Sequence, residues 1–272
     1  MSLQDFKKDN KFLMLALDHR GSFKKFINTT HPEKVSDAEV IANKKIIIES
    51  LENYFSGVLL DPVWGLPAYP QKHKPYLLCL EKTGYSDEGG ERITEIEYSV
   101  KELKEMGASG VKLLIYFNPE AKNKDKQLAT SKKILEEAKA NDMPLFLEII
   151  TYGNEELNKT RKEWVLRSLA LFLDYDIKPE VFKLEYPDDQ DGCEQITKIL
   201  NNIPWILLTR GVSFAVFKNQ LSTAITAGAQ GFLAGRALWQ EIVDYQTIEQ
   251  KQEFLVKVVA KRFAEINKIT LK

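Results

Sequence analysis

The sequence is poor in the residues that bind metals or form disulfides. Its 272 residues include two cysteines, Cys79 and Cys193, and three histidines, His19, His31 and His73. Two cysteines exclude a disulfide framework and a thiolate zinc site. Three histidines leave little for a histidine-rich metal centre. We therefore expect a chemistry that needs neither a metal nor a cofactor.

An excess of charge of one sign and long apolar runs are also lacking. The 38 basic and 39 acidic residues give a net charge of −1, so there is no basic excess of the kind that binds nucleic acid or anionic membranes. No apolar run approaches the roughly 18 residues that span a membrane, and residues 1–11 contain no apolar signal core. These features predict a cytoplasmic protein that binds neither nucleic acid nor membrane.

Short apolar segments alternate along the chain with longer amphipathic segments, which predicts strands alternating with helices. The predicted strands are 12–17, 57–61, 76–80, 111–117, 145–150, 181–186, 205–209 and 231–234. The predicted helices are 37–53, 94–106, 126–140, 161–175, 194–202, 214–227 and 248–266. The interval 62–75 holds four prolines and should contain no helix.

This alternation predicts a parallel sheet, and no linker or change of composition divides the chain. We therefore expect one domain over residues 1–272, an α/β fold closed into a single (β/α)8 TIM barrel. An open doubly wound sheet is the alternative. Such a sheet usually carries a glycine-rich phosphate loop after its first strand, whereas residues 18–22 read Asp-His-Arg-Gly-Ser.

Within each strand, alternate residues form a bulky apolar face and a face that carries charge. Barrel strands point alternate residues into the barrel and toward the helices, and bulky residues such as Leu13, Leu15 and Leu17 suit the helix side. The charged residues that then face the barrel interior are Asp18, Asp61, Glu81, Lys112, Glu148, Lys183, Glu185 and, just past the last strand, Arg236.

Eight charged groups converging from seven strands predict an active site, because barrel active sites lie at the carboxyl ends of the strands. The alternative is a structural network of buried ion pairs. One buried pair would need no function, but a group this large exceeds what structure alone requires.

Two interior lysines beside carboxylates narrow the chemistry to a Schiff base. A lysine becomes nucleophilic when burial or a nearby cation lowers its pKa, and we expect Lys112 and Lys183 to lower each other's pKa. A neutral lysine that attacks a carbonyl forms an electron sink for breaking the adjacent carbon–carbon bond. Glu148 and Glu185 are both candidates for the acid or base of that step. Strand alternation alone does not choose between the two lysines.

The last two strands predict an anion site, since barrels often bind phosphate there through loop N–H groups and a helix N-terminus. We expect Arg236 to contact a phosphate, assisted by Gly211, Ser213 and Gly235. Taken alone, Ser213 is better explained as the N-cap of the following helix. Arg210 follows the inward Thr209, so its side chain is expected toward the helices or at the rim.

Several segments together resemble the family of class I (Schiff-base) tagatose-1,6-bisphosphate aldolases and the related sulfofructose-phosphate aldolases. The resemblance follows the same order along nearly the whole chain. It rests on segments 15–18 (LALD), 81–85 (EKTGY), 110–116 (GVKLLIY), 182–187 (FKLEYP), 211–213 (GVS) and 228–239.

The resemblance implies a metal-independent aldolase in which Lys183 forms the Schiff base. It makes Glu148 the proton-transfer group, Lys112 its neighbouring cation and Asp18 a ligand of substrate hydroxyls. Arg236, with Gly211 and Ser213, would hold the anionic end. Further candidates for substrate binding are Arg210, Gly235, His19, Glu185, Glu81 and Asp61.

Two positions depart from the tagatose enzymes. His19 stands where they carry glutamine, and segment 18–23 looks more like a barrel domain fused to inositol-catabolism kinases, which is thought to cleave a deoxy-phosphogluconate. Arg210 stands where a small residue is usual. Both changes affect substrate recognition.

The leading prediction is cleavage of a ketose (bis)phosphate to dihydroxyacetone phosphate and an aldehyde. The alternatives are a sulfofructose-phosphate aldolase, a 5-dehydro-2-deoxyphosphogluconate aldolase and a phosphosugar-binding sensor without turnover. The partner is in each case a small sugar phosphate or its analogue. A homo-oligomer is left open.

Overall fold

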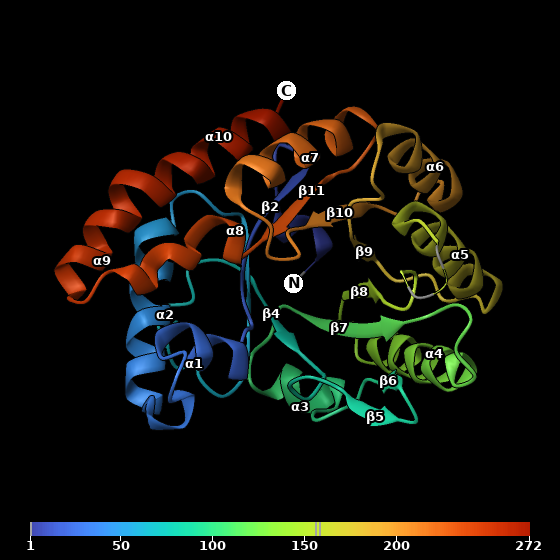
Figure 1. The fold of residues 1–272 in the computed structure, drawn as a ribbon, viewed down its shortest axis with the longest axis horizontal. Helices are drawn as coiled ribbons and strands as arrows, with labels where there is room; N and C mark the ends of the chain where they lie inside the picture. The colour runs from blue at the N-terminus through green and yellow to red at the C-terminus, as the bar shows by residue number, and fades with distance from the viewer. Residues whose placement is uncertain (1, 156, 158) are drawn as a thin grey trace.

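A closed barrel of parallel strands forms the centre of the computed structural model, which describes residues 2–155, 157 and 159–272. Each barrel strand pairs with the next along the chain, and the last, β11, pairs with the first, β2 (Figure 1). The closed (β/α)8 TIM barrel is thus confirmed, and the open sheet is wrong. The barrel strands are β2 (Lys11–Leu17), β3 (Gly57–Leu60), β4 (Tyr76–Cys79), β7 (Gly110–Phe117), β8 (Leu145–Thr151), β9 (Val181–Leu184), β10 (Trp205–Leu208) and β11 (Gly231–Ala234).

Helices form the outer ring around the strands (Figure 1). Most of the longer ones begin at a serine, threonine or aspartate whose side chain accepts a hydrogen bond from a first-turn N–H, such as Ser36, Thr160 and Asp189. The helices are α1 (Gly21–Ile27), α2 (Asp37–Leu51), α3 (Val100–Glu105), α4 (Lys124–Ala140), α5 (Arg161–Asp174), α6 (Gln190–Leu200), α7 (Phe214–Thr226), α8 (Arg236–Trp239), α9 (Ile248–Phe254) and α10 (Ala260–Thr270). A π-helical turn, Leu255–Val259, joins the last two. No helix in the described part of the chain has the length and apolar character to cross a membrane.

The alternation of strand residues produces two apolar layers, of which the sequence predicts the outer one and not the inner one. Leu13, Leu15 and Leu17 pack outward in the large cluster between barrel and helices. Met14 and Phe146 belong to a second cluster inside the barrel. That inner cluster includes Phe6, Phe12, Ala16, Leu59, Leu77, Val181, Ile206 and Leu233. Apolar side chains therefore fill the barrel interior away from the carboxyl ends of the strands, and polar groups gather at those ends.

The N-terminal segment contributes Phe6 to this inner cluster. A short 3₁₀ helix, Leu3–Phe6, leads into β1 (Lys7–Lys8), which pairs antiparallel with β2. The ring of Phe6 lies 5.4 Å from that of Phe146, centroid to centroid, in an edge-on arrangement.

Several elements differ from the sequence prediction. The helix expected over 94–106 begins only at Val100, because Ser99 and Glu102 form a capping box there. The chain before it forms a hairpin of β5 (Ser86–Glu88) and β6 (Glu91–Ile93). The short helices α1 and α8 were not predicted, since neither is long enough to show a helical period.

Candidate active site

A cavity of about 380 Å³ opens at the carboxyl ends of the barrel strands. Most of the residues that the sequence predicts at one site line it, from seven different strands or the loops after them. They are Asp18, His19, Glu81, Lys112, Glu148, Lys183, Arg210, Gly235 and Arg236. The charged residues that strand alternation pointed inward are thus brought together, apart from Asp61 and Glu185.

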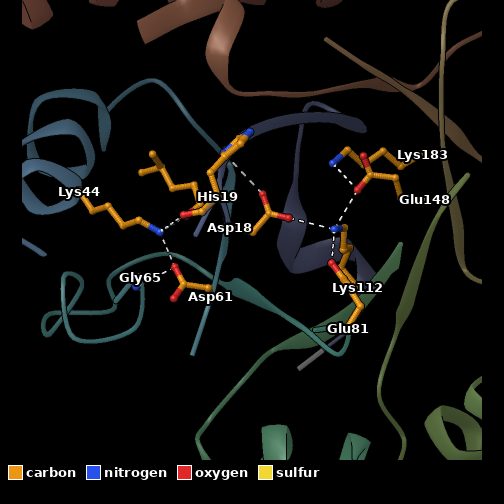
Figure 2. Close-up of polar contacts among 10 residues, drawn as sticks. Asp18, His19, Lys44, Asp61, Gly65, Glu81, Lys112, Glu148 and Lys183 are labelled. Carbon is orange, nitrogen blue, oxygen red and sulfur yellow. Dashed lines mark hydrogen bonds and ion pairs between the residues drawn. The ribbon is translucent and has the colours of Figure 1, made fainter. Parts of the chain in front are cut away.

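Lys112, on β7, lies at the centre of three carboxylates (Figure 2). Its Nζ is 2.9 Å from Asp18 Oδ2, 2.6 Å from Glu81 Oε1 and 2.9 Å from Glu148 Oε2. Burial alone would lower the pKa of Lys112, but the three carboxylates raise it well above its usual value. The expectation that the pKa of Lys112 is lowered by the second lysine is wrong, because the carboxylates outweigh that cation. Lys112 is a permanent positive charge.

Lys183, on β9, has a different environment. Its Nζ lies 2.8 Å from Glu148 Oε2, the oxygen that also faces Lys112. Glu148 is the one carboxylate within 4 Å of this Nζ among the described residues. The Lys183 side chain is 5% exposed and lines the cavity, so a substrate can reach it. Of the two lysines, Lys183 therefore has fewer carboxylate partners among the described residues.

The carboxylates of Asp18 and Glu148 are ionised. Burial would raise the pKa values of Asp18 and Glu148, but Lys112 and Lys183 lower both below their usual range. Glu148 can therefore exchange a proton with Lys183 across their 2.8 Å contact. The arrangement suits transfer of a proton to and from a group bound at Lys183.

His19 faces the cavity as a neutral ring. Burial lowers the pKa of His19 to about 3. The Asp18 carboxylate, whose Oδ1 lies 3.9 Å from His19 Nδ1, raises the pKa and so offsets this effect only in part. The ring packs edge-on against Trp239, and its buried Nδ1 has no hydrogen-bond partner in the described part of the chain. A Cβ on Gly235 would lie 3.0 Å from His19 Cε1, so the close approach of these residues requires glycine.

At the expected anion end, Arg236 is the first residue of α8 and lines the cavity. Its guanidinium lies against Gly211, where a Cβ would be 3.1 Å from Arg236 Cζ. Gly211 also has φ +76°, a conformation that favours glycine. Within the described chain no carboxylate lies within 4 Å of the Arg236 guanidinium, so this cation is available to an anionic ligand. The Ser213 hydroxyl caps α7 by accepting from Val216 N–H at 3.4 Å, and it lies outside the cavity wall.

Glu185 does not face the cavity, and that expectation is corrected. Strand β9 ends at Leu184, so the alternation does not extend to the next residue. Its buried carboxylate accepts from the N–H of Thr151 at 2.8 Å and from the Thr151 hydroxyl at 2.6 Å, and it pairs with Arg210. Both oxygens are engaged, which removes Glu185 as the acid or base. Arg210 reaches the rim, as expected, with its backbone in the left-handed region (φ 47°).

Asp61 is a second correction, because it does not join the cluster. Its fully buried carboxylate accepts from the N–H groups of Val63, Trp64 and Gly65 at 2.7–3.1 Å. It also pairs with Lys44, on α2, which is equally buried. These partners leave no oxygen of Asp61 for a substrate.

Some residues of the site were missed from the sequence. Arg20, Thr83 and Tyr116 also line the cavity. Tyr116 has the inward parity, but it carries no charge and so does not stand out in the pattern of charged residues. Lys44 carried a signal as well, since it lies four residues after Val40 and three before Ile47 on the buried face of α2.

Comparison with known proteins agrees with this geometry. A model of the DeoC/LacD aldolase family matches residues 12–241. Tagatose 1,6-diphosphate aldolases of Staphylococcus aureus strains bovine RF122 / ET3-1 and JH9 are each 32% identical over 292 aligned positions, which cover 94% of this chain and 89% of the relative.

Solved structures of aldolases share the fold. An archaeal fructose-1,6-bisphosphate aldolase, determined with its catalytic lysine bound to a carbinolamine intermediate, superposes with a TM-score of 0.72 at 20% identity, covering 99% of this chain and 98% of that one. Fructose-bisphosphate aldolase from Plasmodium falciparum gives 0.73 at 14% identity, covering 98% and 92%. This chain belongs to the DeoC/LacD family of aldolases, which are lyases.

Proposed function

We propose that this aldolase is a class I enzyme in which Lys183 forms a Schiff base with a ketose bisphosphate. The observation that carries the proposal is the unequal environment of the two lysines. Three carboxylates hold the proton on Lys112, whereas Lys183 shares a single oxygen of Glu148. We therefore assign Lys183, which lines the cavity with a single carboxylate partner, as the amine that attacks the carbonyl.

The site supports each step of the reaction. The Lys183 amine adds to the substrate carbonyl, and loss of water leaves an iminium. Glu148 accepts the proton of the hydroxyl next to the breaking bond, the aldehyde leaves, and the bonding electrons flow to the iminium to form an enamine. Protonation of the enamine and addition of water release dihydroxyacetone phosphate and restore the amine. Lys112 stays charged and keeps Asp18 and Glu148 ionised, and Asp18 orients the substrate hydroxyls.

The substrate class follows from the anion end and the relatives. Arg236 beside Gly211 has no carboxylate partner among the described residues and supplies a cation for the phosphate of the dihydroxyacetone half. The Staphylococcus relatives are named for tagatose 1,6-diphosphate, and we infer a substrate of that type. The sulfofructose-phosphate and deoxy-phosphogluconate alternatives are not favoured, since none of the relatives reported above carries such a name. The sensor without turnover is not favoured, because both lysines and Glu148 are in place. A cytoplasmic location and a homo-oligomer stay predictions.

Borohydride reduction in the presence of dihydroxyacetone phosphate tests the proposal. We expect a stable adduct that peptide mass mapping places on Lys183. Lys183→Met should lose both adduct and turnover, whereas Lys101→Met, on the exposed face of α3, should retain both. An adduct on Lys112, or no adduct while dihydroxyacetone phosphate binds, would contradict the assignment.

A further inference from the structure

A second buried ion pair lies beside the active-site carboxylate Asp18, on the side away from Lys112 (Figure 2). Lys44 Nζ donates to the carbonyl oxygen of Leu17 at 2.7 Å and to that of His19 at 2.8 Å, and it pairs with Asp61. The two carbonyls belong to the residues on either side of Asp18. All three protons of the ammonium group are therefore used, two of them on the backbone that carries Asp18.

The counter-ion is itself held in place by the loop after β3. Three successive N–H groups, from Val63 to Gly65, donate to the Asp61 carboxylate. The loop approaches so closely that a Cβ on Gly65 would lie 2.8 Å from Asp61 N and 2.9 Å from Asp61 Oδ2. The ammonium group of Lys44 thus connects the loop after β3, through Asp61, with the backbone at the end of β2.

Stability alone does not account for this pair. Both side chains are fully buried, and a buried ion pair often stabilises a protein no more than well-packed apolar residues of similar volume. Neither residue lines the cavity, so neither touches the substrate. What the pair does provide is a fixed backbone around a side chain that must meet Lys112 at 2.9 Å.

We propose that Lys44 and Asp61 are positioning residues of the active site, which hold the backbone at residues 17–19 so that Asp18 meets Lys112 and the substrate hydroxyls. The proposal rests on the proposed aldolase function. The physical basis is that reacting groups must be held closely in place, because a misplacement of about 1 Å can reduce the rate about a hundredfold. The fold achieves this at Asp18 by anchoring main-chain carbonyls rather than the carboxylate.

The test compares kcat per functional site in Lys44→Met/Asp61→Asn with that of the wild type. The double substitution removes both charges, which avoids leaving one buried ion unpaired. Sites are counted by borohydride trapping of dihydroxyacetone phosphate on Lys183, so that loss of folded protein does not enter the result. We expect kcat per trapped site to fall about 10- to 100-fold. Lys44→Met alone removes the two contacts to the backbone around Asp18 and serves as a second variant, with a loss of kcat per trapped site in the same direction.

A double-mutant cycle separates positioning from a purely structural role. If the pair acts through Asp18, adding Lys44→Met/Asp61→Asn to Asp18→Asn should change kcat per site less than about threefold. Lys45→Met is the matched control, since Lys45 is the next residue of α2 and its side chain is 47% exposed. It should leave kcat unchanged.

Two results would overturn the positioning role. One is a double variant whose kcat per trapped site lies within about twofold of the wild type. The other is full additivity with Asp18→Asn. A wild-type protein that traps no adduct on Lys183 would instead contradict the proposed function, so the two failures are distinguishable.

Discussion

Lys183 Nζ lies 2.8 Å from Glu148 Oε2, and this one oxygen is also 2.9 Å from Lys112 Nζ. Lys112 has two further carboxylates, whereas Lys183 has no other within 4 Å among the described residues. The two amines share one oxygen, and the two additional carboxylates on Lys112 make their environments unequal. The predictions below depend on this asymmetry.

Lys112→Met should slow turnover by about a hundredfold or more while leaving the borohydride adduct on Lys183. Lys112 keeps the Glu148 carboxylate ionised, and removing a general acid or base function reduces rates by about 10²–10⁴. The same change leaves the carboxylates of Asp18 and Glu81 without the Lys112 cation, which destabilises the fold by about 3–5 kcal/mol. Thermal unfolding should accompany the kinetics. A folded Lys112→Met protein that forms no adduct would make Lys112 the nucleophile.

Arg236→Ala should lower kcat/KM about 10- to 100-fold. A charge-assisted hydrogen bond contributes about 1.5–3 kcal/mol, and Arg236 has no carboxylate partner in the described chain to compete for it. Steady-state kinetics on a ketose bisphosphate measure the change. Arg167→Ala, which removes an exposed arginine paired with Glu120 on the outer ring, is the control. If the two variants behave alike, the phosphate binds elsewhere.

Chelation should leave activity intact. Among the described residues, no three histidine, cysteine, aspartate or glutamate side chains are grouped so that they could hold a metal ion. The proposed iminium supplies the electron sink that a metal would otherwise provide. The rate of aldehyde release before and after treatment with a chelator is the measurement. Loss of activity that a divalent ion restores would refute the Schiff-base mechanism.

His19 should make the folded protein sensitive to acid. Its pKa of about 3 in the folded state lies below the value of about 6.5 expected in the unfolded chain. Between these values the unfolded state binds more protons, so the stabilisation is complete above pH 6.5 and declines as the pH falls toward 3. The decline is about 1.4 kcal/mol per pH unit for one proton.

Urea unfolding of wild type and His19→Gln at pH 7 and pH 5 measures this effect. The wild type should lose about 2 kcal/mol more than the variant over that interval. His31→Gln is the control, because the His31 ring is 51% exposed. Equal losses in wild type and His19→Gln would show that His19 titrates alike in both states.

How much of the site can be predicted from the sequence depends on where each strand ends. Inside the strands, Lys112, Glu148 and Lys183 face the interior as the alternation predicts, because strand side chains repeat with a period of two. Asp61 and Glu185 follow the last residues of their strands. Asp18 and Glu81 also lie beyond their strand ends, and they still face the interior. Beyond a strand end the ladder of hydrogen bonds no longer fixes the direction of a side chain, so its local partners decide where it points: Lys112 for Asp18 and Glu81, Lys44 for Asp61 and Arg210 for Glu185.

The sequence by itself therefore determined the barrel, its charged interior and the face on which that charge gathers, since these depend on local periodicity and on the order of strands and helices. Only the tertiary structure decided what each charged residue does. The pKa of Lys112 depends on Asp18, Glu81 and Glu148, which come from three other strands. The pairing of Lys44 with Asp61 joins a helix to a loop. Such energies vary with distances of a few ångströms between distant segments, and no local pattern encodes those distances.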